Sequence, residues 1–196
     1  MTQKIARVIS ILGHPFLTIP LYTLIITFSL MEVQKAVFIS LTIIGGFFIP
    51  ISLWNFVKTR KGIYTNFDVS DQKQRNSMYL FAISALLIVL AVFYFTNQSH
   101  NLILVILFAL MLLISSYVVN FSVKCSGHTS LTIFLSFLVL PVSFTAAMIM
   151  LVCAVAIGWS RLALKRHTFT EVVAGMILGL MVGTSMLYFQ GYFDSL

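Results

Sequence analysis

Long apolar runs alternate with short polar segments along the sequence. The runs are Val8–Leu30, Ala36–Val57, Met78–Thr96, Leu102–Asn120, Leu131–Trp159 and Val172–Tyr188. A helix needs about 20 mostly apolar residues to cross a bilayer, and each run approaches or exceeds that length. The pattern predicts an all-α fold, an integral membrane helical bundle with six to seven transmembrane or re-entrant helices. No repeat or low-complexity segment interrupts it, so we expect a single domain over residues 1–196.

The run between His128 and Ser160 decides how the polar segments are arranged. As one straight helix, its ~31 residues would extend roughly 46 Å and would place its two ends on opposite membrane faces. Pro141 interrupts helical hydrogen bonding, so we predict a hairpin of two short helices that turns near Leu140-Pro141. Both ends then lie on one face, which also receives the polar segments near 58–77, 122–130 and 160–171.

The composition agrees with a membrane protein. Hydrophobic residues make up 60% of the chain and charged residues 9%, which is too few charges for a soluble surface. The net charge of +7 lies in short loops, which argues against nucleic acid and for membrane orientation, lipid head groups or phosphate as partners. The two cysteines do not make a disulfide framework. Val8–Leu30 is longer than a signal-peptide core and is expected to be a retained first helix.

The cations also predict an orientation. All lysines and arginines except Lys35 fall on the face that carries the three polar segments, whereas Glu32, Lys35 and Asp194 fall on the other. The positive-inside rule places the cation-rich face in the cytoplasm. We therefore expect a multi-pass protein of a bacterial-type inner membrane.

The polar segment at 160–171 contains Arg161, His167 and Glu171 between two apolar runs. Ionisable groups are costly at the edge of a bilayer, so they indicate a functional site. On a helix, His167 and Glu171 are spaced i, i+4 and share one side. The carboxylate can hold one imidazole nitrogen and leave the other for nucleophilic or basic chemistry. The alternative is an interfacial loop with scattered charges.

Two further polar patches add candidates. In the first, Ser126, Gly127 and His128 precede a predicted helix that Thr129 or Ser130 can open, and a helix N-terminus favours an oxyanion. In the second, Lys73 and Arg75 could clamp a phosphate. The alternatives are an ordinary helix cap for the first patch and a topology signal for the second. His14 could touch a lipid head group or could simply be an interfacial histidine before a helix.

Two of these patches resemble the type-2 phosphatidate phosphatase family, the membrane branch of the acid phosphatase and vanadium haloperoxidase superfamily. The family's second motif is Pro-Ser-Gly-His, and this chain has Cys125-Ser126-Gly127-His128. Its third motif is Ser-Arg, five residues, His, three residues, Asp; this chain has Ser160-Arg161, His167 and Glu171 at the same spacing, followed by Val-Val-Ala-Gly175. In the first motif Arg75 matches, whereas Asp68 replaces a lysine and Asn76 a proline.

The resemblance implies a phosphatase-like transmembrane domain that hydrolyses a lipid phosphomonoester, or pyrophosphate, through a phosphohistidine and without a metal or cofactor. His167 would be the nucleophile, Glu171 would orient it, and His128 would protonate the leaving group. The phosphoryl oxygens would be held by Arg161, Arg75, Lys73, Ser126 and Gly127. The expected partners are a lipid phosphate and the bilayer lipids, and the sequence does not indicate an oligomeric state.

Three alternatives stay open at this point. The chain could be a catalytically weak or inactive protein that binds or transports lipid phosphate on the same scaffold, or a small channel or scaffold protein. A zinc site from Cys125, His128 and His167 is conceivable, but its spacing matches no common pattern.

Overall fold

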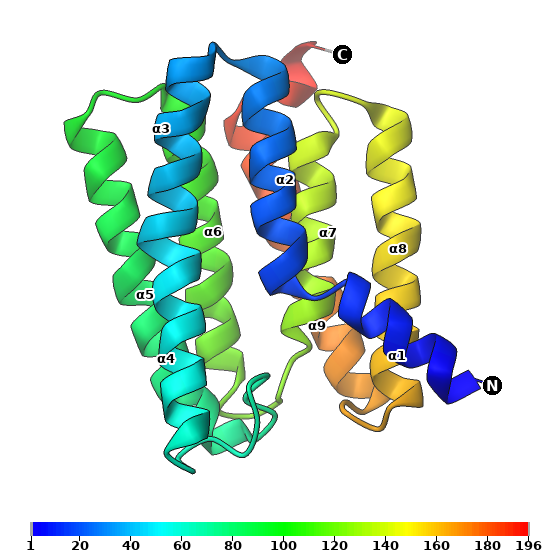
Figure 1. The fold of residues 1–196 in the computed structure, drawn as a ribbon. Coiled ribbons are helices and arrows are strands. Elements are labelled where there is room, and N and C mark those ends of the chain that lie inside the picture. The colour runs from blue at the N-terminus through cyan, green and yellow to red at the C-terminus, as the bar shows by residue number, and fades with distance from the viewer. Residues whose placement is uncertain (1, 196) are drawn as a thin grey trace. The chain divides into compact units, whose positions relative to one another are not determined.

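The computed structural model describes residues 2–195, and within them the chain is helical with no strand. The elements are α1 (Thr2–Leu12), α2 (Pro15–Leu30), α3 (Val33–Ile43), the π-helix η1 (Ile44–Phe48), α4 (Ile49–Arg60), α5 (Gln72–Phe95), α6 (His100–Val119), α7 (Gly127–Val139), α8 (Phe144–Ala163), α9 (Phe169–Phe189) and the 3₁₀ helix η2 (Tyr192–Ser195). Figure 1 shows their course along the chain. The predicted all-α fold is confirmed.

The helices are built for a bilayer. Five spans in the described part of the chain are long and apolar enough to cross it, and there are six if α1 and α2 together form one more. The five are Val33–Arg60, Gln72–Phe95, His100–Val119, Phe144–Ala163 and Phe169–Phe189. Large apolar side chains stay exposed on them, for example Phe95 and Val152. Together with the length of the five spans, such a surface fits a multi-pass membrane protein.

The chain divides into two compact units, which we describe separately. Unit 1 comprises Met1–Pro15 and His100–Leu196, and unit 2 comprises Phe16–Ser99. The expectation of one functional domain over residues 1–196 stays a prediction.

The hairpin predicted at Leu140-Pro141 is present in unit 1. α7 ends at Val139, α8 begins at Phe144, and Ser143 caps α8 by accepting a hydrogen bond from the Ala146 amide at 3.2 Å. α7 packs against α8 and α9 (Figure 1). A Cβ added at Gly158, near the end of α8, would lie 3.7 Å from Thr129 Oγ1, near the start of α7. The two outer ends of the hairpin therefore meet, and the polar segments 122–130 and 160–171 lie at the same end of unit 1.

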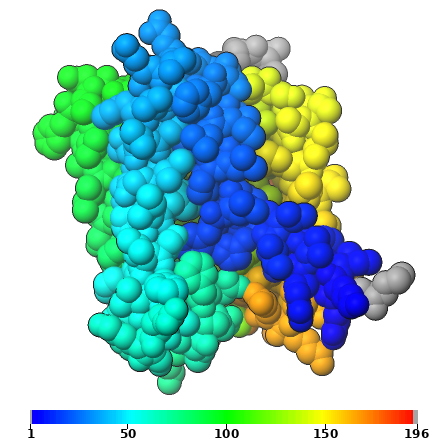
Figure 2. All heavy atoms as spheres, in the orientation of Figure 1, coloured from blue at the N-terminus to red at the C-terminus, as the bar shows by residue number. Residues whose placement is uncertain are grey.

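The first apolar run differs from the prediction of one helix over Val8–Leu30. α1 begins earlier, at Thr2, and ends at Leu12, while α2 begins at Pro15. Proline disfavours the helical conformation of the residue before it, so the helix breaks at Gly13-His14. α1 packs against α8 within unit 1, and Figure 2 shows α1 in dark blue beside yellow and orange atoms of the later part of unit 1.

Unit 2 is held together by the apolar span Val33–Arg60, in which α3, η1 and α4 run on continuously. α2 is joined to α3 by a hydrogen bond between the Thr27 and Ser40 hydroxyls at 2.8 Å. α5 packs along η1 and α4, where Trp54 stacks on Phe81 with ring centroids 4.3 Å apart. The 58–77 segment is part of this unit.

Candidate active site

The turn between α8 and α9 explains the spacing of Arg161 and His167. The Arg166 amide donates to the Arg161 carbonyl at 3.0 Å, and the Lys165 amide donates to the Leu162 carbonyl at 2.9 Å. These two bonds, with Lys165 at a φ of +54°, form a Schellman motif that ends α8. The His167 amide also donates to the Arg161 carbonyl, at 3.3 Å. The backbone carbonyl of Arg161 therefore holds the backbone of His167 in place.

α9 begins with a capping box that fixes Glu171. The Thr168 hydroxyl accepts from the Glu171 amide at 3.3 Å, and Glu171 Oε2 accepts from the Thr168 amide at 3.2 Å. Together these bonds satisfy two amides that a helix start leaves without intrahelical partners. The capping box therefore holds the carboxylate in place independently of its contact with His167.

His167 and Glu171 form the pair predicted from their spacing. His167 Nδ1 lies 2.8 Å from Glu171 Oε2, and the His167 side chain is buried at 1% exposure. A carboxylate that accepts from Nδ1–H selects the tautomer with its lone pair on Nε2. The additional methylene of Glu, compared with the family's Asp, does not prevent this contact.

Lys124 is a neighbour of this pair that the sequence did not single out. Its Nζ lies 3.6 Å from Glu171 Oε2 and donates to the Arg166 carbonyl at 3.2 Å. Its side chain is 19% exposed. The amine therefore links the segment before α7 to the turn before α9 and stabilises the Glu171 carboxylate.

The Ser126-Gly127-His128 segment meets α9 through its backbone. The Ser126 amide donates to the Glu171 carbonyl at 2.9 Å, and Gly175 makes this approach possible, because an added Cβ would lie 2.6 Å from the Ser126 carbonyl oxygen. Ser126 is also the N-cap of α7, so this helix begins before Thr129 and Ser130, in contrast to the prediction. The Ser126 hydroxyl bonds instead to the Thr129 hydroxyl at 3.0 Å, and both residues are buried.

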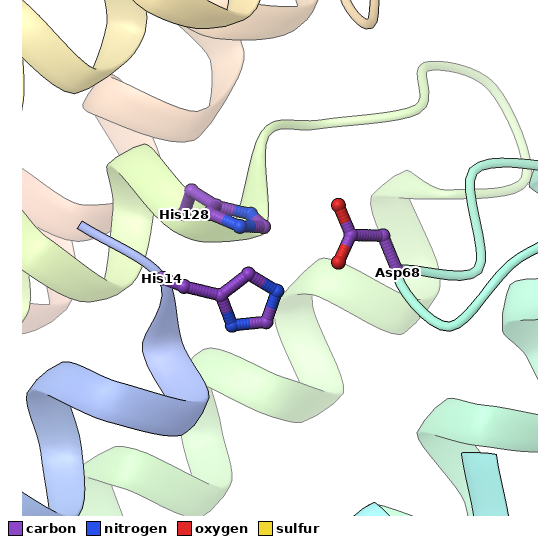
Figure 3. Close-up of side chains that lie close together, drawn as sticks. All are labelled: His14, Asp68 and His128. Atoms are coloured by element: carbon purple, nitrogen blue, oxygen red, sulfur yellow. The ribbon is translucent and has the colours of Figure 1, made fainter. Parts of the chain in front are cut away.

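His128 lies in the first turn of α7 and is 7% exposed. The ring of His14, from the break between α1 and α2, packs edge-on against it with the centroids 4.8 Å apart (Figure 3). The sequence allowed two roles for His14, a contact with a lipid head group or a place at the interface before a helix. The structure makes it a neighbour of a candidate catalytic residue.

Arg161 is the most deeply buried cation of unit 1, at 1% exposure. Its Nη1 donates to the hydroxyl of Ser10, on α1, at 2.9 Å. A guanidinium is expensive to bury in a membrane protein and usually marks a functional site. The other two predicted cations belong to unit 2, where Lys73 is exposed and the Arg75 Nε donates to the Val69 carbonyl at 3.0 Å. Their part in a phosphate site stays a prediction.

The fold and this site define a class: a helical membrane protein in which a buried histidine pairs with a carboxylate, in a turn that follows a buried arginine, near a helix N-terminus. Residues 115–195 match the family model of the PAP2 superfamily. The matched region contains α7, α8 and α9, and the match confirms the resemblance seen in the two motifs. It supports a phosphatase-type function. No curated protein and no solved structure matched the chain.

Proposed function

We propose that the protein is a membrane phosphatase that hydrolyses a phosphomonoester, or pyrophosphate, of a lipid through a phosphohistidine at His167. The observation that carries this proposal is the 2.8 Å contact between His167 Nδ1 and Glu171 Oε2, within the region that matches the PAP2 superfamily. A histidine oriented by a carboxylate is the arrangement that nucleophilic catalysis requires.

In the first step, His167 Nε2 attacks phosphorus, and the bond from phosphorus to the lipid oxygen breaks. The ring of the phosphohistidine, with its proton on Nδ1, is cationic, and the Glu171 carboxylate stabilises it. His128 gives a proton to the departing alkoxide. In the second step, His128 takes a proton from water, the water oxygen bonds to phosphorus, and the N–P bond breaks. Orthophosphate leaves, and Nε2 regains its lone pair.

Three groups of unit 1 would hold the phosphoryl oxygens. Arg161 supplies a guanidinium from the end of α8, and the Ser126 hydroxyl and Gly127 amide lie at the start of α7, where the helix dipole favours an anion. These donors are fixed before the substrate arrives, which is the condition for stabilising charge that develops in the transition state. The part of Lys73 and Arg75 in holding phosphate stays a prediction.

A lipid substrate fits the surroundings of these residues. Phe169, two residues after His167, is 72% exposed, and Trp159, two residues before Arg161, is 40% exposed. These apolar surfaces adjoin the polar site at the ends of membrane helices, so a phosphate could bind among the cations while its acyl chain stays in the bilayer.

The chemistry of the donors supports metal independence. The sequence has five carboxylate side chains, and the matched region has two of them, Glu171 and Asp194. Mg²⁺ binds through carboxylates and phosphate oxygens, whereas Glu171 Oε2 already accepts hydrogen bonds from His167 and Thr168. We therefore expect activity to survive EDTA.

The orientation is also a proposal. The cation-rich segments would face the cytoplasm of a bacterial-type inner membrane, as the positive-inside rule requires. The test introduces single cysteines into the 58–77 segment and treats intact cells with a thiol reagent that does not cross membranes. Cysteines that are labelled in intact cells would show that the orientation is the opposite one.

The decisive experiment is a phosphate-release screen over lipid phosphates with purified wild type, His167→Ala and His100→Ala. His100 is an exposed histidine at the start of α6 and serves as the matched control. We expect His167→Ala to abolish release and the control to keep it. Labelled phosphoenzyme should map to His167, and vanadate should inhibit. Tight binding of lipid phosphate without release by the wild type would indicate a binding or transport protein instead.

A further inference from the structure

α1 packs on α8 through a face of small residues. Ala6 is fully buried and Ser10 is 4% exposed. Gly13, just after α1, approaches α8 so closely that an added Cβ would lie 2.4 Å from Ile157 Cδ1. The other faces of α1 carry exposed side chains, among them Lys4, Arg7 and Val8. This face therefore brings α1 close enough to α8 for a short side chain to reach Arg161.

Ser10 is the residue that makes this contact. Its hydroxyl oxygen accepts from Arg161 Nη1 at 2.9 Å, and both residues are almost completely buried. A guanidinium is a flat group at the end of a long flexible chain, and its planar fork defines the directions in which it can donate. A hydrogen bond to one terminal nitrogen therefore restricts the orientation of the plane and the directions of the other N–H bonds.

We propose that Ser10 is a positioning residue that sets the guanidinium of Arg161 in the orientation that receives the phosphoryl group. The inference rests on the proposed function, since it assigns Arg161 the phosphoryl oxygens. Ser10 lies outside the region that matches the PAP2 superfamily, residues 115–195. The site of this chain is thus completed by an N-terminal helix that the family motifs do not include.

Vanadate binding tests the inference directly, because vanadate mimics pentacoordinate phosphorus. Affinity is measured by calorimetry on the purified full chain for wild type, Ser10→Ala and the isosteric Ser10→Cys, whose thiol is a weak acceptor. Both variants should bind vanadate roughly tenfold more weakly, the size expected for loss of a hydrogen bond to a charged group. Ser136→Ala is the matched control, because Ser136 is a buried serine of unit 1 whose hydroxyl bonds the Ile133 carbonyl of its own helix.

A double-mutant cycle separates positioning from a merely structural effect. In an Arg161→Ala background, Ser10→Ala should leave vanadate affinity unchanged, because the group that it positions is gone. An equal loss in both backgrounds, or wild-type affinity in both Ser10 variants, would overturn the inference. If Ser10→Ala does not fold, Ser10→Cys gives the same comparison.

Phosphate release by the same samples distinguishes the two proposals. A wild type that releases no phosphate from any lipid phosphate refutes the proposed function, and the vanadate cycle still decides the role of Ser10. A wild type that does not bind vanadate refutes the inference as well. An active wild type with unchanged Ser10 variants refutes the inference alone.

Discussion

Replacing Glu171 by Gln separates the charge of this side chain from its structural role. Gln is a natural capping-box residue, so its carbonyl oxygen can still accept from the Thr168 amide and from His167 Nδ1. In the wild type, Glu171 Oε2 makes both contacts, at 3.2 Å and 2.8 Å. The substitution therefore leaves the start of α9 intact and removes only the negative charge.

The expected loss of rate follows from that charge. The phosphohistidine ring is cationic, and a hydrogen bond to a charged partner contributes about 1 to 2 kcal/mol more than one between neutral groups. At 1.36 kcal/mol for each factor of ten, kcat should fall roughly 5- to 30-fold. Lys124 Nζ, 3.6 Å from Oε2, then opposes the cationic ring without a carboxylate between them, which favours the upper part of that range.

The assay is kcat for phosphate release, with the thermal unfolding midpoint measured on the same samples. Glu171→Gln should unfold within a few degrees of the wild type. Thr168→Ala is the complementary control: it removes the capping hydroxyl, costs about 1 kcal/mol of stability and changes kcat little, because the Thr168 amide remains. A Glu171→Gln variant with wild-type kcat would refute the proposed role of the carboxylate.

Three further changes test individual parts of the site. Gly175→Ala should destabilise unit 1 by about 1 to 3 kcal/mol, because its Cβ would meet the Ser126 backbone at 2.6 Å. Gly45→Ala is the control, because its Cβ meets nothing within 4 Å, and the thermal unfolding midpoints of the two variants are compared. Lys165→Gly should raise the midpoint, because it removes a left-handed strain of roughly 1 kcal/mol, and a lowered midpoint would contradict the Schellman assignment. Lys124→Met should change kcat less than roughly fivefold, because the pair of Lys124 with Glu171 is partly exposed, and higher salt should reduce the difference.

The fold could be predicted where the sequence has a strong local signal. Apolar length identifies the membrane helices, and Pro141, within a run too long for one straight helix, predicts the α7–α8 hairpin. The same argument applies to His14-Pro15, where a proline also ends helical geometry at the residue before it. The break there lies within a run of ordinary spanning length, so length alone gave no reason to divide it.

The site could be predicted where its residues are close in sequence. The His167–Glu171 pair follows from i, i+4 spacing, and the Thr-x-x-Glu pattern at 168–171 is a recognisable capping box that was missed. Lys124 has no such signal, because its contacts are with residues more than 40 positions away. Ser10 is 151 positions from Arg161, and only the packing of α1 on α8 brings the two together.

The replacement of the family's Asp by Glu171 need not weaken the nucleophile, and the geometry gives a reason. Glu171 Oε2 must reach back to the Thr168 amide while it accepts from His167, and it does both at 3.2 Å and 2.8 Å. A shorter Asp starts one methylene further from both groups and reaches a capping amide less well than Glu at this helix position. Glu171→Asp should therefore keep the charge at the cost of the cap. A lowered unfolding midpoint with a kcat above that of Glu171→Gln is the expected result, and the reverse order of the two rates would show that position matters more than charge at this carboxylate.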